Sequence, residues 1–143
     1  MILVLIMNLN IATVESIIHE GTPKTPTIKV NPETGQILIE GRSNPENSAK
    51  FYKPLIEWFD EYIKKPAVST EMHIRLEHFN TSSSKCILDV FKRVKNLKEM
   101  GVPYLINWYY EDDDEEMLET IEIYEHLTKL EFNKIPVPEE KFG

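Results

Sequence analysis

Hydrophobic spacing typical of strands alternates with spacing typical of helices along this chain, and that alternation restricts the fold more than any other feature. Strand-like spacing occurs at five places, which are residues 27–31, 36–40, 71–79, 104–110 and 129–136. Helix-like spacing separates the last four of them, at residues 45–64, 82–100 and 117–128. Parallel strands need long crossover connections, which are usually helices. The order β-β-α-β-α-β-α-β therefore predicts a single-domain α/β fold with a partly parallel sheet.

Turn and cap residues support this division of the chain into strands and helices. Residues 32–35 predict a tight turn in which Gly35 adopts positive φ, so the first two strands form an antiparallel hairpin and the sheet is mixed. Asn44 and Pro45 predict the N-cap and first residue of the first helix. Gly101 ends the second helix. The buried stripe of that helix is predicted to be Ile87, Val90, Phe91, Val94 and Leu97.

Alternation within residues 71–79 predicts which side chains share a face of the sheet. One face is predicted to carry Met72, Ile74, Leu76 and His78, and the other Glu71, His73, Arg75, Glu77 and Phe79. His73 and His78 then face opposite sides, which argues against a joint catalytic role. In the next strand, Trp108, Tyr109 and Tyr110 are predicted to divide between core and surface, and Cys86 is predicted to be a small buried residue.

The composition excludes several classes of protein. A net charge of −8 argues against nucleic-acid binding through phosphates, which needs a basic face. A single Cys cannot form an internal disulfide, so a secreted disulfide scaffold is excluded. Hydrophobic residues make up 41% of the 143 residues, which is enough for one packed domain. The class that remains is a soluble, cytoplasmic acidic domain.

The two ends of the chain are predicted to lie outside the domain, which is placed at residues 17–136. Residues 1–16 are interpreted as an N-terminal extension without an assigned role, and residues 137–143 as a loose tail. Residues 1–7 are apolar, but they lack the basic start of a signal peptide and are too short for a membrane helix. Met1 and Met7 both remain open as the natural start.

Four consecutive hydroxyl side chains, at residues 81–84, lie where a predicted strand leads into a predicted helix. Backbone N–H groups and the positive end of a helix dipole meet at such a junction. Plain N-capping needs only one such residue. A phosphoacceptor is the second interpretation, because a phosphate would add about 1.5–2 negative charges where the dipole tolerates them, with Lys85 one turn after Thr81. A nucleophilic Ser is the third, although the junction lacks the glycines of a nucleophile elbow.

The acidic run at residues 111–116 resembles a calcium loop only superficially. That loop requires Gly at its sixth position and Glu at its twelfth. Counting from Asp112, those positions hold Met117 and Ile123, so the pattern fails and no metal is predicted. Two interpretations remain, namely an acidic loop favoured by the dipole of the following helix, or a surface recognised by a basic partner.

Four segments in this order resemble those of a known family: Thr-Pro-Lys-Thr-Pro at 22–26, Gly-Arg-Ser-Asn-Pro-Glu-Asn at 41–47, Phe-Asn-Thr-Ser-Ser-Ser-Lys at 79–85, and Asn-Trp-Tyr-Tyr-Glu at 107–111. Over roughly residues 17–136 the chain resembles the SiaC family of bacterial regulatory phosphoproteins, formerly a domain of unknown function. The order of strands and helices is also similar to that of the anti-sigma-factor antagonist (STAS) fold. The resemblance therefore implies a STAS-like domain.

The resemblance also implies a function. In SiaC-like proteins a Thr that follows an Asn at a helix start is phosphorylated by a partner kinase, and a PP2C-type phosphatase removes the phosphate. The unmodified form engages a diguanylate cyclase and promotes cyclic-di-GMP synthesis, with effects on aggregation or biofilm formation. The implied phosphoacceptor is Thr81. The residues implied to support the phosphate or to bind a partner are Asn80, Ser82, Ser83 and Lys85.

The resemblance implies no catalytic residue, metal or cofactor, and no nucleic-acid or membrane partner. The alternative that stays open is a STAS-like binding module that recognises a protein or a small molecule without phosphorylation. A hydrolase is disfavoured, because the sequence shows no nucleophile–base pair.

Overall fold

The computed structural model describes residues 14–142, which form a six-stranded sheet whose spatial order is the order of the strands in the sequence. The first three strands pair antiparallel, and β3 to β6 pair parallel. The mixed α/β fold predicted from the sequence is confirmed. Most of the predicted extension, residues 1–13, lies outside the described residues. The strands are β1 (Ile17–His19), β2 (Thr27–Asn31), β3 (Gln36–Ser43), β4 (Thr70–Phe79), β5 (Tyr104–Glu111) and β6 (Asn133–Val137).

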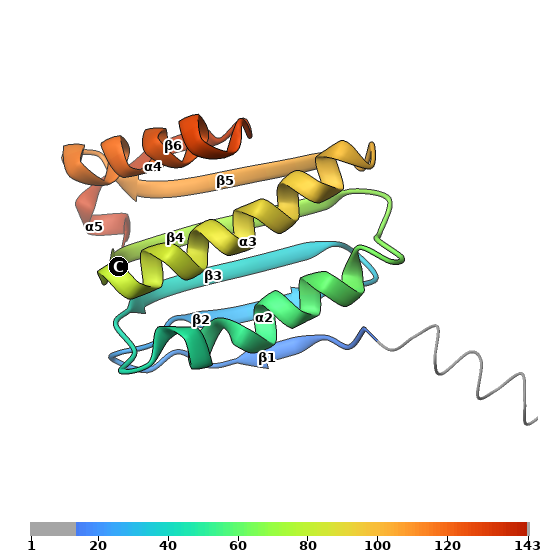
Figure 1. Ribbon diagram of the computed structural model, residues 1–143. Helices are drawn as coiled ribbons and strands as arrows, with labels where there is room; N and C mark the ends of the chain where they lie inside the picture. Colours follow the sequence, from blue (N-terminus) through green and yellow to red (C-terminus); the bar gives the residue numbers. More distant parts are fainter. Residues whose placement is uncertain (1–13, 143) are drawn as a thin grey trace, which may run out of the picture.

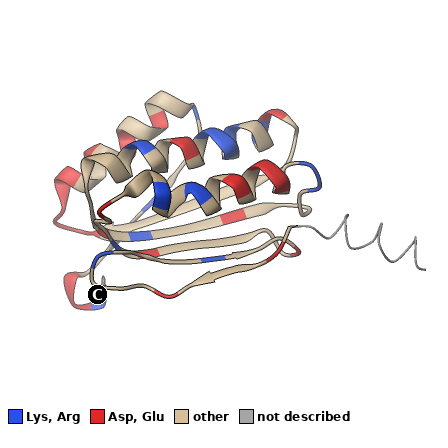
Figure 2. Ribbon diagram, turned by 60° about the horizontal axis from the view of Figure 1, so that its bottom comes forward, with Lys and Arg blue, Asp and Glu red and all other residues tan. Residues whose placement is uncertain are grey.

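Three long helices cover one face of this sheet (Figure 1). They are α2 (Ser48–Tyr62), α3 (Thr81–Glu99) and α4 (Glu115–Thr128), and each connects one parallel strand to the next. Because β3, β4, β5 and β6 follow one another in a single direction across the sheet, crossovers of one hand place all three helices on the same side. Figure 2 shows the short α5 (Glu139–Phe142) below the opposite face.

The core lies between the sheet and the three long helices. All five residues of the predicted α3 stripe are buried, as is Cys86, and Trp108 is fully enclosed. Trp108 stacks with Tyr124 of α4 at a ring-centroid distance of 5.7 Å and lies 5.8 Å from the ring of Phe91 in α3. Tyr110 is also buried and Tyr109 half-buried, so the predicted division of these aromatics is confirmed.

Both ends of the domain differ from the prediction. Strand β1 was missed, because three residues are too few to show alternation. The prediction of a loose tail is wrong for residues 137–142, since Val137 ends β6 and α5 follows it. Phe142 is only 4% exposed, and the Arg75 guanidinium lies 5.7 Å from its ring. A cation–π contact therefore holds α5 to the sheet.

A β-bulge changes the faces predicted for the end of β4. Gly41 of β3 pairs with Leu76, but Arg42 pairs with His78, so Glu77 is an extra residue. The prediction that His78 shares the buried face and Phe79 the other is wrong, because Phe79 packs against the core and His78 is exposed. The same shift removes the basis for placing His73 and His78 on opposite faces.

The first long helix starts later than predicted. The N-cap of α2 is Asn47 and not Asn44, since the Asn47 side chain accepts a hydrogen bond from the Lys50 amide at 3.1 Å. Pro45 accordingly lies before the helix, where it is buried. Asn44 has another role, described below.

We expect Asn47→Ala to lower the free energy of unfolding by about 1 kcal/mol, because the Lys50 amide loses its cap. Urea unfolding followed by circular dichroism measures the loss, and hydrogen exchange of the Lys50 amide localises it. Glu46→Ala is the matched control, since the Glu46 side chain is exposed and makes no hydrogen bond within the described residues, so its loss leaves the Asn47 cap intact. Faster exchange at Lys50 in the Glu46 variant alone would contradict the assignment.

Candidate functional site

The candidate site lies at the end of the sheet where the parallel strands β3, β4 and β5 finish and α2, α3 and α4 begin (Figure 1). The junction between β4 and α3 is a single residue, Asn80. Its extended backbone and short amide side chain suit an N-cap, and its Oδ1 accepts a hydrogen bond from the Ser83 amide at 2.9 Å. The backbone amide of Asn80 donates to the Ser43 carbonyl at 2.9 Å, which ties this turn to the end of β3.

Thr81 differs from the three hydroxyl residues that follow it. Its side chain is exposed and makes no side-chain hydrogen bond to the residues that the structure describes. The Ser82 hydroxyl lies 2.7 Å from Ser48 Oγ and donates to Asn80 Oδ1 at 3.2 Å. The Ser84 hydroxyl donates to the Thr81 carbonyl at 2.6 Å. Asn80 already caps the helix, so the Thr81 hydroxyl is not needed for capping.

Ser83 lies in the interior. It is 0% exposed, and its hydroxyl accepts from Ser43 Oγ at 2.8 Å and lies 3.2 Å from Ser48 Oγ. Ser43 Oγ is in turn 2.6 Å from the hydroxyl of Tyr52 in α2. Burial raises the pKa of Tyr52 to about 12, and the hydrogen bond with Ser43 partly opposes this rise. Sequence reasoning missed Ser43, Ser48 and Tyr52, because only the tertiary fold brings their hydroxyls to Ser83.

Lys85 is exposed one turn after Thr81 on α3, as predicted, and forms no ion pair with the side chains that the structure describes. Residues i and i+4 of a helix are neighbours on its surface. The ammonium group of Lys85 is therefore available to an anion on residue 81. Of the predicted site residues, Asn80, Ser82 and Lys85 surround Thr81 at the surface, whereas Ser83 lies beneath it.

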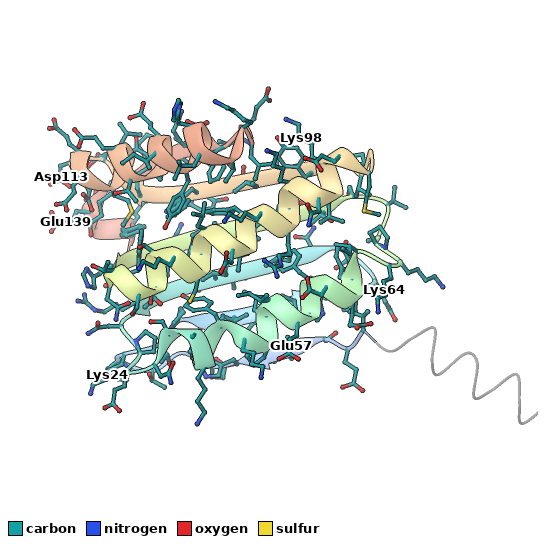
Figure 3. The ribbon with its side chains drawn as sticks, in the orientation of Figure 1. Lys24, Glu57, Lys64, Lys98, Asp113 and Glu139 are labelled. Carbon is teal, nitrogen blue, oxygen red and sulfur yellow. The ribbon has the colours of Figure 1, made fainter. Side chains whose placement is uncertain are left out.

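The acidic run occupies another part of the same end of the sheet. Asp114 is the N-cap of α4, with its Oδ1 accepting from the Met117 amide at 2.9 Å, which confirms that the run leads into a helix start. Figure 3 shows Asp113 and Glu139 beside one another, so α5 adds further carboxylates to the surface of the acidic run. Desolvation raises the pKa of Glu111 above its usual range, and repulsion by the neighbouring carboxylates, Glu139 first, raises it further.

Two kinds of feature are absent from the described part of the chain. Within residues 14–142 no helix has both the length and the hydropathy needed to span a membrane. In the same residues no three His, Cys, Asp or Glu side chains are grouped so that they could hold a metal ion.

Comparison with known proteins relates the whole domain to one family. The model of the SiaC family regulatory phosphoproteins matches residues 19–137. Apo-SiaC from Pseudomonas aeruginosa is similar in structure, with a TM-score of 0.76 at 26% identity, over 84% of this chain and 98% of that one. An uncharacterized protein of Pseudomonas aeruginosa (strain UCBPP-PA14) is 29% identical over 102 residues, which are 71% of this chain and 81% of that protein.

A second crystal structure carries information about a partner. A chain in the structure of the diguanylate cyclase SiaD in complex with its activator SiaC, from Pseudomonas aeruginosa, matches with a TM-score of 0.79 at 26% identity. The match covers 85% of this chain and 99% of that chain. Since the family model spans the described domain from β1 to β6, the chain belongs to the SiaC family of regulatory phosphoproteins.

Proposed function

We propose that this chain is a cytoplasmic, non-enzymatic partner switch controlled by reversible phosphorylation of Thr81. The observation that carries the proposal is the difference among four adjacent hydroxyls. Thr81 is exposed and unengaged within the described residues, whereas Ser82, Ser83 and Ser84 are each held by hydrogen bonds. A kinase needs an accessible hydroxyl, and among these four residues Thr81 offers it at the smallest structural cost.

The start of α3 suits the product of this reaction. The kinase transfers the γ-phosphoryl group of ATP, so the bond from Thr81 Oγ to phosphorus forms, the bond to ADP breaks, and the hydroxyl proton leaves. The new group carries about 1.5–2 negative charges at neutral pH. It lies at the positive end of the α3 dipole and within one turn of Lys85, and both favour an anion. The fold therefore tolerates the phosphate, while the charge of the surface offered to a partner changes sign.

The proposed partners are a kinase, a PP2C-type phosphatase that hydrolyses the phosphate, and a diguanylate cyclase. Support for the cyclase comes from the structural similarity to SiaC, the activator of the diguanylate cyclase SiaD. We propose that the unmodified form binds and activates a cyclase of this kind, and that α3 supplies much of the contact surface. Asn80, Ser82 and Lys85 border the surface at which the phosphate acts, and Ser83 supports it from the interior.

Incubation with ATP and the proposed partner kinase should label Thr81 and no other residue. Mass spectrometry of the digested protein locates the phosphate, and Thr81→Ala should reduce labelling to background. Ser84→Ala is the matched control, because its hydroxyl binds only the Thr81 carbonyl and its loss should leave labelling within about twofold.

Full labelling of Thr81→Ala would contradict the assignment of the phosphoacceptor. An absence of phosphate anywhere in residues 81–84 would favour the alternative, a STAS-like module that binds a protein or small molecule without phosphorylation. In that case the hydroxyls at this junction serve only to cap α3 and to join it to α2.

A further inference from the structure

The two residues that flank Thr81 in the sequence also hold the start of α2. On one side, the Asn80 side-chain amide donates to Asn44 Oδ1 at 3.0 Å and to the Pro45 carbonyl at 3.4 Å. On the other side, Ser82 Oγ lies 2.7 Å from Ser48 Oγ. Ser48 is the first residue of α2 and is 3% exposed. The segment just before α2 and its first residue are thus both bound to neighbours of the phosphoacceptor.

Asn80 is the centre of this arrangement. Besides its two bonds to the segment before α2, its Oδ1 accepts from the Ser83 amide at 2.9 Å and from Ser82 Oγ at 3.2 Å. Ser48 Oγ lies 3.4 Å from the same oxygen. A change in the position of one amide side chain therefore affects the starts of two helices.

A phosphate on Thr81 would compete for these donors. Hydrogen bonds to an ionised acceptor are roughly twice as strong as neutral ones, and a phosphate presents three such oxygens. The outer oxygens also reach further from the backbone than the Thr hydroxyl does. The donors on the flanking residues are the Asn80 amide, which serves the link to the segment before α2, and the Ser82 hydroxyl, which donates to Asn80 Oδ1. The Ser82 oxygen also lies 2.7 Å from Ser48 Oγ, so turning this hydroxyl to the phosphate weakens the link to the first residue of α2.

We propose that phosphorylation of Thr81 releases the start of α2, so that residues 44–51 form a second part of the switch surface. This inference rests on the proposed function, since it takes Thr81 as the phosphoacceptor. Ser82 and Asn80 act as positioning residues that join the two parts. In the unmodified state they hold residues 44–51 in one arrangement, and in the phosphorylated state their donors turn to the phosphate and that segment loosens.

The test compares the unmodified chain with a chain that carries phosphothreonine at position 81, inserted during translation by an orthogonal phosphothreonine tRNA system. Hydrogen exchange of peptides is followed by mass spectrometry. We expect amides in residues 44–51 to exchange about fivefold faster with the phosphate, the factor expected for the loss of one hydrogen bond. A peptide from residues 115–124, at the start of α4, should exchange at an unchanged rate.

Two variants make the test specific. Ser82→Ala lacks one of the two links, so its unmodified form should already exchange faster at residues 44–51, and the phosphate should add less than in the parent chain. Ser84→Ala lacks a hydroxyl that takes no part in the links, so it should respond to the phosphate as the parent does. Ser82 and Ser84 both lie outside the buried core, so both variants should fold.

Three results would overturn the proposal. The first is a change in exchange rate confined to residues 81–85, and the second is an equal increase in exchange at residues 44–51 in the parent and in Ser82→Ala. The third is faster exchange of the α4 peptide, which would report a general loosening of the domain. Because the phosphate enters during translation, such a result counts against the link to α2 alone. Failure of the kinase to label Thr81 would instead count against the proposed function.

Discussion

A phosphate on Thr81 is expected to weaken binding to the proposed diguanylate cyclase partner by about two to four orders of magnitude. An uncompensated charge buried in an interface costs about 3–5 kcal/mol, and each 1.4 kcal/mol is about a tenfold change in affinity. The unmodified Thr81 side chain is exposed and uncharged, so it can be covered without this penalty. Isothermal titration calorimetry of the two forms against the proposed cyclase partner measures the difference.

Substitutions at the same position separate charge from the hydroxyl itself. Thr81→Ala should bind the cyclase with nearly the affinity of the unmodified chain, because it removes a side chain that makes no hydrogen bond within the described residues. Thr81→Glu should show only part of the loss, since a carboxylate carries one charge and two oxygens. Equal affinity of the phosphorylated and unmodified chains would reject the switch and favour binding without phosphorylation.

Gly35→Ala is expected to lower the free energy of unfolding by more than about 3 kcal/mol, a larger loss than the removal of a helix cap causes. Gly35 has a φ of +74°, and a Cβ there would overlap the Ser69 carbonyl oxygen and lie 3.0 Å from the Tyr62 hydroxyl. The Gly35 carbonyl also accepts from the Glu71 amide at 2.8 Å, so the turn cannot move away without breaking a link to β4. The positive φ confirms the turn predicted from the sequence.

Gly101→Ala provides the matched control. Its φ of +83° is also positive, but among the described residues no neighbouring atom lies within 4 Å of the position that a Cβ would take. The control therefore carries only the backbone strain of the left-handed region, about 1–2 kcal/mol. Urea unfolding of both variants, followed by tryptophan fluorescence, gives the difference. Equal losses in the two variants would show that the contact with Ser69 relaxes and that strain alone determines the cost.

Sequence patterns predicted the elements that are long and regular. In helix α3 the helical spacing predicted a stripe of five buried residues, and each of them lies in the core. The patterns failed where a tertiary contact decides the structure. Strand β1 exists because its backbone pairs with β2, and α5 because Phe142 packs under Arg75. The bulge at Glu77 depends on the pairing of β3 with β4, which no local pattern records.

The candidate site was predictable in part for the same reason. The exposed side of the junction, Asn80 to Lys85, is contiguous in the sequence, and the hydroxyl run drew attention to it. The other side comes from the end of β3 and the start of α2, about 35 residues earlier. Nothing local indicates that Ser48 and Ser82 meet, and Ser83 could not be recognised as buried until that packing was known.

The sheet order described above also bears on how the chain is made. Every strand that the structure describes pairs with the strand that precedes or follows it in the sequence. As the polypeptide leaves the ribosome, each new strand therefore finds its neighbour already synthesised, and the sheet can grow from β1 towards β6 in the direction of translation. On this route Thr81 and its supporting hydroxyls can assemble before α4 and α5 have left the ribosome. The candidate site would then be among the earlier parts of the protein to form.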